Sequence, residues 1–246
     1  MKKTILSLAV FAAASCGVQG AVTLSSHSRF DSDTDGWQEG GASPNPPSQT
    51  ANPSWDGNPG YLINTSTGSG VAGSRFVMFH LGSDWTGDYL GAGVSAISIY
   101  VDNWSGAGST LPLAIAFNGP GGWFLSDPVG VTDVTPGVAE WQRVQFDLSV
   151  ANFTRASGNG TLADTLGDVS RFEILLEDGA GVSVSRNNIR GERLAADLRF
   201  DDIRAVPEPS NLGLILLGGL ISLGRRKRSR AVAAHRGGPR ESFYFS

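Results

Sequence analysis

The stretch Trp141-Gln142-Arg143-Val144-Gln145-Phe146-Asp147-Leu148 alternates apolar and polar side chains with a period of two. Successive side chains of an extended strand point to opposite faces, so Val144, Phe146 and Leu148 share one face and the charged residues between them point away. Residues 97–102 alternate in the same way. Both stretches therefore predict half-buried β-strands.

Similar short runs, rich in β-branched and aromatic residues, alternate with Gly, Asp, Asn and Pro along the middle of the chain. This pattern is typical of an all-β sandwich or barrel. The runs predict eight strands, at Gly60–Thr65, Arg75–Leu81, Val94–Trp104, Leu111–Asn118, Gly122–Ser126, Trp141–Leu148, Phe172–Glu177 and Leu194–Ala205. Eight strands favour a jelly-roll β-sandwich, whose two sheets bury their apolar faces against each other.

The other parts of this domain, taken as residues 21–205, are expected to be less regular. One helical turn is predicted at Leu162–Leu166. The segment Gly40–Asn58 carries four prolines, and we expect it to form an extended surface connection. The core is expected to include Phe76, Phe117, Phe146 and Phe172. Glu173 and Glu177 are expected on the solvent face of their strand.

Charge is distributed unevenly along the 246 residues. Residues 21–206 carry 10 Arg and no Lys against 21 Asp and Glu, a net charge of −11, whereas residues 207–246 carry 7 basic residues against 2 acidic ones. Affinity for nucleic acids rests mainly on Lys and Arg side chains that neutralise phosphates. The domain is therefore expected to bind neither DNA nor RNA.

Residues 1–20 have the three parts of a secretory signal peptide. Two lysines come first, an apolar run follows from Ile5 to Ala14, and small residues lead to Gly20. We expect signal peptidase to cut before Ala21, which also removes Cys16, the single cysteine of the chain. The alternatives are a buried N-terminal helix and a lipoprotein that is acylated at Cys16.

The C-terminal part has the layout of one membrane anchor. An uncharged run at 211–224 precedes a basic cluster formed by Arg225, Arg226, Lys227 and Arg228. Fourteen helical residues span about 21 Å, less than the roughly 30 Å of the hydrocarbon core, so this transmembrane helix is short. The basic cluster is expected to stay cytoplasmic, which leaves the domain outside. The alternative is a buried core helix.

Residues 206–228 resemble the PEP-CTERM sorting signal of Gram-negative envelope proteins, through Pro207-Glu208-Pro209, the apolar run and the basic cluster. The resemblance implies that an exosortase-type enzyme processes the chain at Pro207, Glu208 and Pro209. It also implies that the inner membrane holds the precursor transiently through 211–224, before the protein reaches the envelope, surface or extracellular matrix. Residues 229–246 continue past the usual end of such a signal and are expected to form a disordered tail.

Four short motifs carry a second resemblance. Asp31–Trp37, Gly57–Leu62, Trp141–Leu148 and Leu198–Ile203 together resemble bacterial jelly rolls of the laminin domain IV and carbohydrate-binding-module-like group. The resemblance implies glycan binding or adhesion rather than catalysis.

An acidic turn raises the possibility of calcium. Asp31, Asp33, Asp35 and the following glycine match the opening of an EF-hand loop, but Ala42 stands where that loop needs its bidentate Glu. The first and last strands of a jelly roll often lie side by side, which would bring Asp201 or Asp202 near the turn. The alternatives are a structural Ca²⁺ site that joins the two segments and a solvated turn that caps local backbone amides.

Catalytic patterns are scarce. After export the domain would have no cysteine and two histidines, His27 and His80, and it contains neither a Gly-x-Ser-x-Gly nor a His-Glu-x-x-His motif. His80 is expected to be a packed residue. We therefore expect a non-enzymatic, structural or adhesive protein of the cell surface that requires no cofactor.

The alternative function is binding of an extracellular polysaccharide. Sugar rings stack on exposed aromatic side chains, and the candidates are Trp55, Trp85, Trp104 and Trp123. Two exposed, coplanar aromatic rings on one sheet face would favour glycan binding, whereas tryptophans placed wholly in the core would favour a scaffold.

Overall fold

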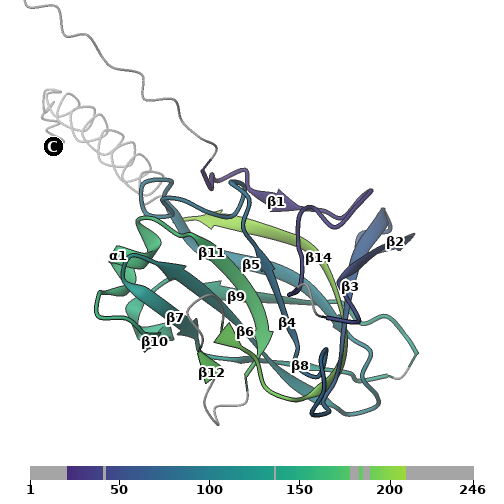
Figure 1. The fold of residues 1–246 in the computed structure, drawn as a ribbon. Helices are drawn as coiled ribbons and strands as arrows, with labels where there is room; N and C mark the ends of the chain where they lie inside the picture. Colours follow the sequence, from purple (N-terminus) through teal and green to yellow (C-terminus); the bar gives the residue numbers. More distant parts are fainter. Residues whose placement is uncertain (1–20, 41–42, 136, 178–182, 185–188, 209–246) are drawn as a thin grey trace, which may run out of the picture. The chain divides into compact units, whose positions relative to one another are not determined.

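The computed structural model describes residues 21–40, 43–135, 137–177, 183–184 and 189–208. This part of the chain is almost entirely β-structure arranged in two antiparallel sheets (Figure 1). Sheet I has the strand order β2-β3-β14-β5-β9, with β1 paired to β14. Its strands are β1 (His27–Ser28), β2 (Ser48–Pro53), β3 (Pro59–Thr67), β5 (Val94–Asn103), β9 (Gln142–Asp147) and β14 (Ala195–Pro207).

Sheet II has the order β10-β7-β6-β11-β4, with β8 paired to β6. Its strands are β4 (Val77–His80), β6 (Thr110–Gly119), β7 (Gly122–Ser126), β8 (Val129–Thr132), β10 (Phe153–Ser157) and β11 (Arg171–Leu176). The short strands β12 (Ser183–Val184) and β13 (Ile189–Arg190) pair with each other. A 3-10 turn at Val150–Asn152 precedes β10, and helix α1 (Leu162–Leu166) follows it.

The strand order confirms a jelly roll. All eight predicted strands are present, as β3, β4, β5, β6, β7, β9, β11 and β14. Along the chain the strands alternate between the sheets, with β3 and β5 in sheet I and β4 and β6 in sheet II. The first and last of the eight strands, β3 and β14, are neighbours in sheet I. The interleaving of two Greek keys produces this order. The described domain is thus a β-sandwich of the jelly-roll class.

The core lies between the two sheets and is apolar because each strand turns one alternating face inward. Ile97, Ile99 and Val101 of β5 are fully buried, whereas the outward residues of β9 are exposed. The four phenylalanines predicted for the core are buried, and His80 is packed at 3% exposure. Helix α1 has the predicted bounds, and Thr161 and Asp164 form a capping box at its start.

The proline-rich segment departs from its prediction as a simple connection. Residues 48–53 form β2, an edge strand of sheet I that pairs with β3. Proline is tolerated at an edge because its missing N–H costs no ladder bond. Hairpin β2–β3 has Trp55 in its turn and is the element that positions the candidate site.

The terminal predictions lie outside the described residues. They are the signal peptide 1–20, the apolar run 211–224, the basic cluster Arg225–Arg228 and the tail 229–246. Of the Pro-Glu-Pro motif, Pro207 ends β14 opposite Val94, and the Glu208 N–H donates to the Gly93 carbonyl at 3.3 Å. Within the described ranges, no helix is long and apolar enough to span a membrane.

Candidate functional site

The outer face of sheet I carries aromatic and charged side chains. Alternation along β5 points Tyr100 and Asp102 outward, opposite the buried residues of the core. On β14, Arg199 lies opposite Asp102 and Asp201 lies opposite Tyr100. Among the described residues no second sheet covers this face, so its groups are available to a ligand wherever the described loops leave them open.

Trp55 is the most accessible aromatic ring on this face. Its ring stacks on Tyr100, with centroids 3.9 Å apart and planes 6° from parallel. Trp55 is nevertheless 38% exposed. Because Tyr100 covers one face of the indole, the exposed area belongs to the other face and the ring edge. The pair forms a platform with a free aromatic surface.

The turn that presents Trp55 is held by Asp56. The Asp56 carboxylate accepts hydrogen bonds from the Ser54 hydroxyl at 3.0 Å and from the Asn58 N–H at 2.8 Å and side-chain amide at 2.6 Å. The backbone bond to Asn58 lowers the pKa of Asp56. Gly57 supplies the left-handed conformation, φ +81°, that closes the turn. Trp55 therefore sits on an ordered loop.

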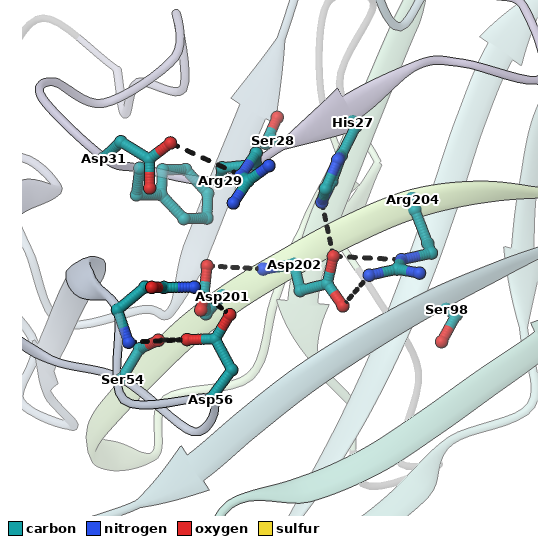
Figure 2. Close-up of polar contacts among 12 residues, drawn as sticks. His27, Ser28, Arg29, Asp31, Ser54, Asp56, Ser98, Asp201, Asp202 and Arg204 are labelled. Carbon is teal, nitrogen blue, oxygen red and sulfur yellow. Dashed lines mark hydrogen bonds and ion pairs between the residues drawn. The ribbon is translucent and has the colours of Figure 1, made fainter.

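A pocket of about 100 Å³ adjoins the platform. Its charged lining residues come from three segments: His27, Arg29 and Asp31 near β1, Asp56 in the hairpin turn, and Asp201, Asp202 and Arg204 on β14. Figure 2 shows how these side chains converge from β1, β14 and the turn. A space this small accommodates hydroxyl or amide groups of a ligand, not a whole sugar ring.

Asp202 anchors one side of the pocket. It lies in a bulge of β14, where the pairing with β5 moves from Asp201 directly to Arg204, and its φ is +52°. Its carboxylate contacts His27 Nε2 and is held by the Arg204 guanidinium, whose Nε donates at 2.9 Å (Figure 2). The bulge turns this carboxylate toward His27 of β1 and toward Arg204 of its own strand.

Asp201, on the other side of the pocket, is 5% exposed. Burial raises the pKa of Asp201 to about 6, although the neighbouring Ser54 hydroxyl and the hydrogen bond from the Asp202 N–H oppose this shift. Nearby Asp202 and Asp56 raise the pKa further through charge repulsion. Asp201 can therefore exchange its proton near neutral pH, either accepting or donating a hydrogen bond to a ligand.

A second aromatic ring on the same face, Trp104, is covered by Arg199, which pairs with Asp102. The Arg199 guanidinium lies 3.2 Å from the centre of the Trp104 ring and within 4.0 Å of the Asp102 carboxylate. Trp104 donates its indole N–H to Asp102, and the Glu140 N–H donates to the same carboxylate at 3.0 Å. Arg199 covers one face of Trp104, as Tyr100 covers one face of Trp55, but Trp104 is half-buried whereas Trp55 is exposed, so Trp55 is the better stacking surface.

Two of the four predicted stacking residues are corrected by their burial. Trp85 is 1% exposed and Trp123 is 2% exposed. Trp85 packs on Trp37 and Phe172 between the sheets, and its N–H donates to Ser28. Neither ring can contact a ligand. Tyr100 and Asp56 were not singled out from the sequence, although the alternation along β5 already puts Tyr100 on the polar face.

The acidic turn makes local bonds. Asp35 accepts from the Arg29 and Phe30 N–H groups at 2.7 and 2.8 Å, and Asp33 accepts from the Asp35 N–H at 2.7 Å. Asp31 pairs with Arg29 at 3.3 Å and lines the same pocket as Asp201 and Asp202. These bonds are of the kind expected of a capping turn.

The structure brings Asp31, but not Asp33 or Asp35, to the pocket that Asp201 and Asp202 line. In the part of the chain that is described, no group of three or more His, Cys, Asp or Glu side chains is placed to hold a metal ion. A structural calcium ion stays a prediction, and no part of the proposed function depends on it.

Glu173 is another buried titratable group, and its predicted place on a solvent face is wrong. It is 0% exposed, and Glu177 is 3% exposed. Glu173 accepts hydrogen bonds from Arg171 Nε at 2.6 Å and from the Ile189 N–H at 3.0 Å. Burial raises the pKa of Glu173 to about 7, although Arg171 opposes the shift. Strand β13 covers this face of sheet II, which the alternation of β11 alone does not reveal.

Comparisons with known proteins add little. No family model matches the chain, and no curated protein matches it. Among solved structures, the chain is similar to the N-terminal cellulose-binding domain of β-1,4-glucanase C from Cellulomonas fimi. That match has 11% identity, a TM-score of 0.39, and coverage of 77% of this chain and 99% of that one. The fold assignment therefore rests on the strand order itself.

Proposed function

We propose that the domain is a non-catalytic glycan-binding module, and that the Trp55–Tyr100 platform is its principal contact with a sugar ring. The observation that carries the proposal is the exposed face of Trp55 on a parallel aromatic partner. Apolar C–H faces of sugars pack well on such rings, because the contact buries apolar surface without burying hydroxyl groups. The criterion of two exposed, coplanar rings is not met, because Tyr100 is half-buried and stacks against Trp55 instead of lying beside it in one plane.

The adjoining pocket supplies the polar half of the interaction. Binding sites combine an apolar surface with a few fixed polar groups that set orientation. Asp56, Asp201 and Arg204 stand beside Trp55 and offer acceptors and donors for sugar hydroxyls. Each is held in place before a ligand arrives, Asp56 by Asn58, Asp201 by the Asp202 N–H and Arg204 by the Asp202 carboxylate, which reduces the ordering cost of binding.

The hydrogen bonds of these carboxylates favour a role in binding over a role in hydrolysis. Glycosidases need one carboxyl group as an acid and another as a base or nucleophile across the scissile bond. Here Asp56 is committed to its turn and Asp202 to His27 and Arg204. We therefore assign these groups to binding and positioning.

The sequence supports export as the setting for this function. The signal-peptide pattern at 1–20 and the PEP-CTERM resemblance at 206–228 together favour delivery to the envelope or matrix, where polysaccharide is abundant. An adhesive role follows if the domain attaches the protein to that polysaccharide. Val206 and Pro207 belong to β14, so a deletion that includes them would damage the sandwich. A truncation that tests sorting alone therefore begins at Pro209. Loss of residues 209–228 is expected to move the protein from the envelope to the medium or periplasm, and an unchanged distribution would contradict the sorting role.

The binding test is a glycan screen followed by affinity electrophoresis in gels that contain the polysaccharides found. Trp55→Ala is expected to weaken binding about tenfold or more, as is common for a central Trp contact. Leu90→Ala is the matched control, because Leu90 is 50% exposed and lies outside the site. Equal retardation of the two variants would contradict the assignment of Trp55, and absence of any glycan ligand would contradict the function.

A further inference from the structure

A second pocket, of about 460 Å³, lies apart from Trp55. It is lined by Glu39, Gly40 and Ser43 ahead of β2, and by residues 70–75 and Val77 at the start of β4. Arg190 at the end of β13 and Arg193 beyond it complete the lining. None of its lining residues belongs to the pocket beside Trp55. Its volume falls within the range of about 300–1,000 Å³ that is typical of small-molecule sites.

The pocket concentrates positive charge in an acidic domain. Arg75, Arg190 and Arg193 line it, which is three of the 10 Arg among residues 21–206. Arg75 is oriented by the bond from its Nη1 to the Gly191 carbonyl, at 2.6 Å. Arg190 and Arg193 are exposed, and neither forms an ion pair within the described residues. Their guanidinium donors are therefore available to an anion.

Glu39 gives the same pocket a buried acceptor. It is 9% exposed, and its Oε1 has no hydrogen-bond partner among the described residues. Burial raises the pKa of Glu39, while Ser43 and Asn64 partly offset the effect. A buried polar atom without a partner is costly, so a ligand hydroxyl that donates to Oε1 would be stabilising.

These two features call for one ligand that has an anionic group and hydroxyl donors together. A sulfate ion lacks the hydroxyl donors, and a neutral sugar lacks the anion. We propose that this pocket is a subsite for an anionic sugar, a ring that carries a carboxylate or sulfate beside free hydroxyls. The arginines hold the anionic group by charge-assisted hydrogen bonds, and Glu39 accepts from a hydroxyl.

The choice of a sugar as the ligand rests on the proposed glycan binding. The inference extends that function to acidic polysaccharides. The net charge of −11 on residues 21–206 opposes a polyanion at long range. At physiological salt the screening length is about 8 Å, so remote carboxylates are largely screened and the local charge of the pocket governs the contact.

Affinity electrophoresis of the purified chain in gels that contain polygalacturonate, dextran sulfate or neutral dextran tests the subsite. Retardation is expected in at least one acidic gel, and the gel that retards identifies carboxylate or sulfate as the anion. Arg190→Gln and Arg193→Gln should each weaken this binding about tenfold. Arg155→Gln is the matched control, because Arg155 is an exposed arginine that lies outside both pockets.

Absence of retardation in both acidic gels would overturn the proposal, as would equal retardation of the Arg190, Arg193 and Arg155 variants. The Trp55→Ala variant separates the two sites. It should lose binding of the glycan found in the screen and keep Arg190-dependent binding of the acidic polysaccharide. If the Arg190→Gln variant also lost retardation in gels of neutral dextran, the subsite would not be specific for an anionic sugar, which would contradict the proposal.

Discussion

The Trp55 and Tyr100 rings lie parallel at 3.9 Å, one at the tip of hairpin β2–β3 and the other on the outer face of β5. Forty-five positions separate them in sequence, and strands β3 and β14 separate hairpin strand β2 from β5 in sheet I. The contact therefore exists only because the hairpin turn reaches over the sheet. It fixes the indole plane before any ligand is present.

Removal of the lower ring tests this support. Tyr100→Ala removes the ring that stacks under Trp55, so the indole loses its support. Glycan binding is expected to weaken by about 0.5–1.5 kcal/mol. Tyr100→Phe keeps the stacking surface and should bind as the parent protein does. Titration calorimetry and Trp fluorescence measure the two effects. If the Phe variant bound as weakly as the Ala variant, the phenol hydroxyl rather than ring stacking would be responsible.

The glycine at the start of β3, Gly60, should matter more than the glycine in the hairpin turn, Gly57. Gly60 has a φ of +116°, and a Cβ there would lie 2.8 Å from the Asp31 Cα. Gly60→Ala is therefore expected to destabilise the fold by more than about 1 kcal/mol. Gly57 has a φ of +81° but open space around it, so Gly57→Asn should cost little. Chemical denaturation compares them, and similar losses of stability for the two would contradict the steric argument.

Stability should fall as the pH rises from about 4.5 to about 7. The pKa of Glu173 is raised to about 7 in the folded protein from an ordinary value of 4.5, so the folded state holds this proton more tightly than the unfolded chain does. The proton bound in this window stabilises the fold, and its loss costs on the order of 1–3 kcal/mol by pH 8. Asp201, with a pKa of about 6, contributes with the same sign.

Unfolding free energies measured between pH 5 and 8 provide the check. Glu173→Gln should show a smaller decline over this range, because it has no proton to lose. Asp127→Asn removes one exposed carboxyl group and serves as the control for charge. A decline of the same size in Glu173→Gln as in the parent protein would assign the pH dependence to other groups.

Calcium is tested by thermal unfolding with millimolar Ca²⁺ and with excess chelator. If an ion joins the Asp31 segment to Asp201 and Asp202, Ca²⁺ should raise the Tm by offsetting carboxylate repulsion, with an effect that grows with its concentration. An Asp31→Ala, Asp201→Asn double variant should lose that response. Equal Tm values in the two buffers would leave the turn as a hydrogen-bonded acidic loop.

Local pattern alone determined the fold class. Alternation within stretches such as 141–148 identified the eight strands of the jelly roll, because the period of two reflects which face of a strand is buried. The predicted pairing of first and last strands also followed from that class. The sequence pattern does not predict β1, β2, β8, β10, β12 and β13, because these strands are short, lie next to glycine or proline, or pair at the edges of sheets.

Only the tertiary structure decided which of several residues with similar local sequence are buried and which are exposed. Trp55, Trp85 and Trp123 all lie among glycines or polar residues in the sequence, yet only Trp55 is exposed. Trp85 packs on Trp37 and Phe172, and Trp123 packs in the buried cluster that β13 covers. Glu173 alternates like a solvent-facing residue but lies beneath β13. Arg75, Arg190 and Arg193 come together from distant segments. Local sequence records the preference of each strand for two faces, whereas burial and clustering depend on which remote segment covers each face.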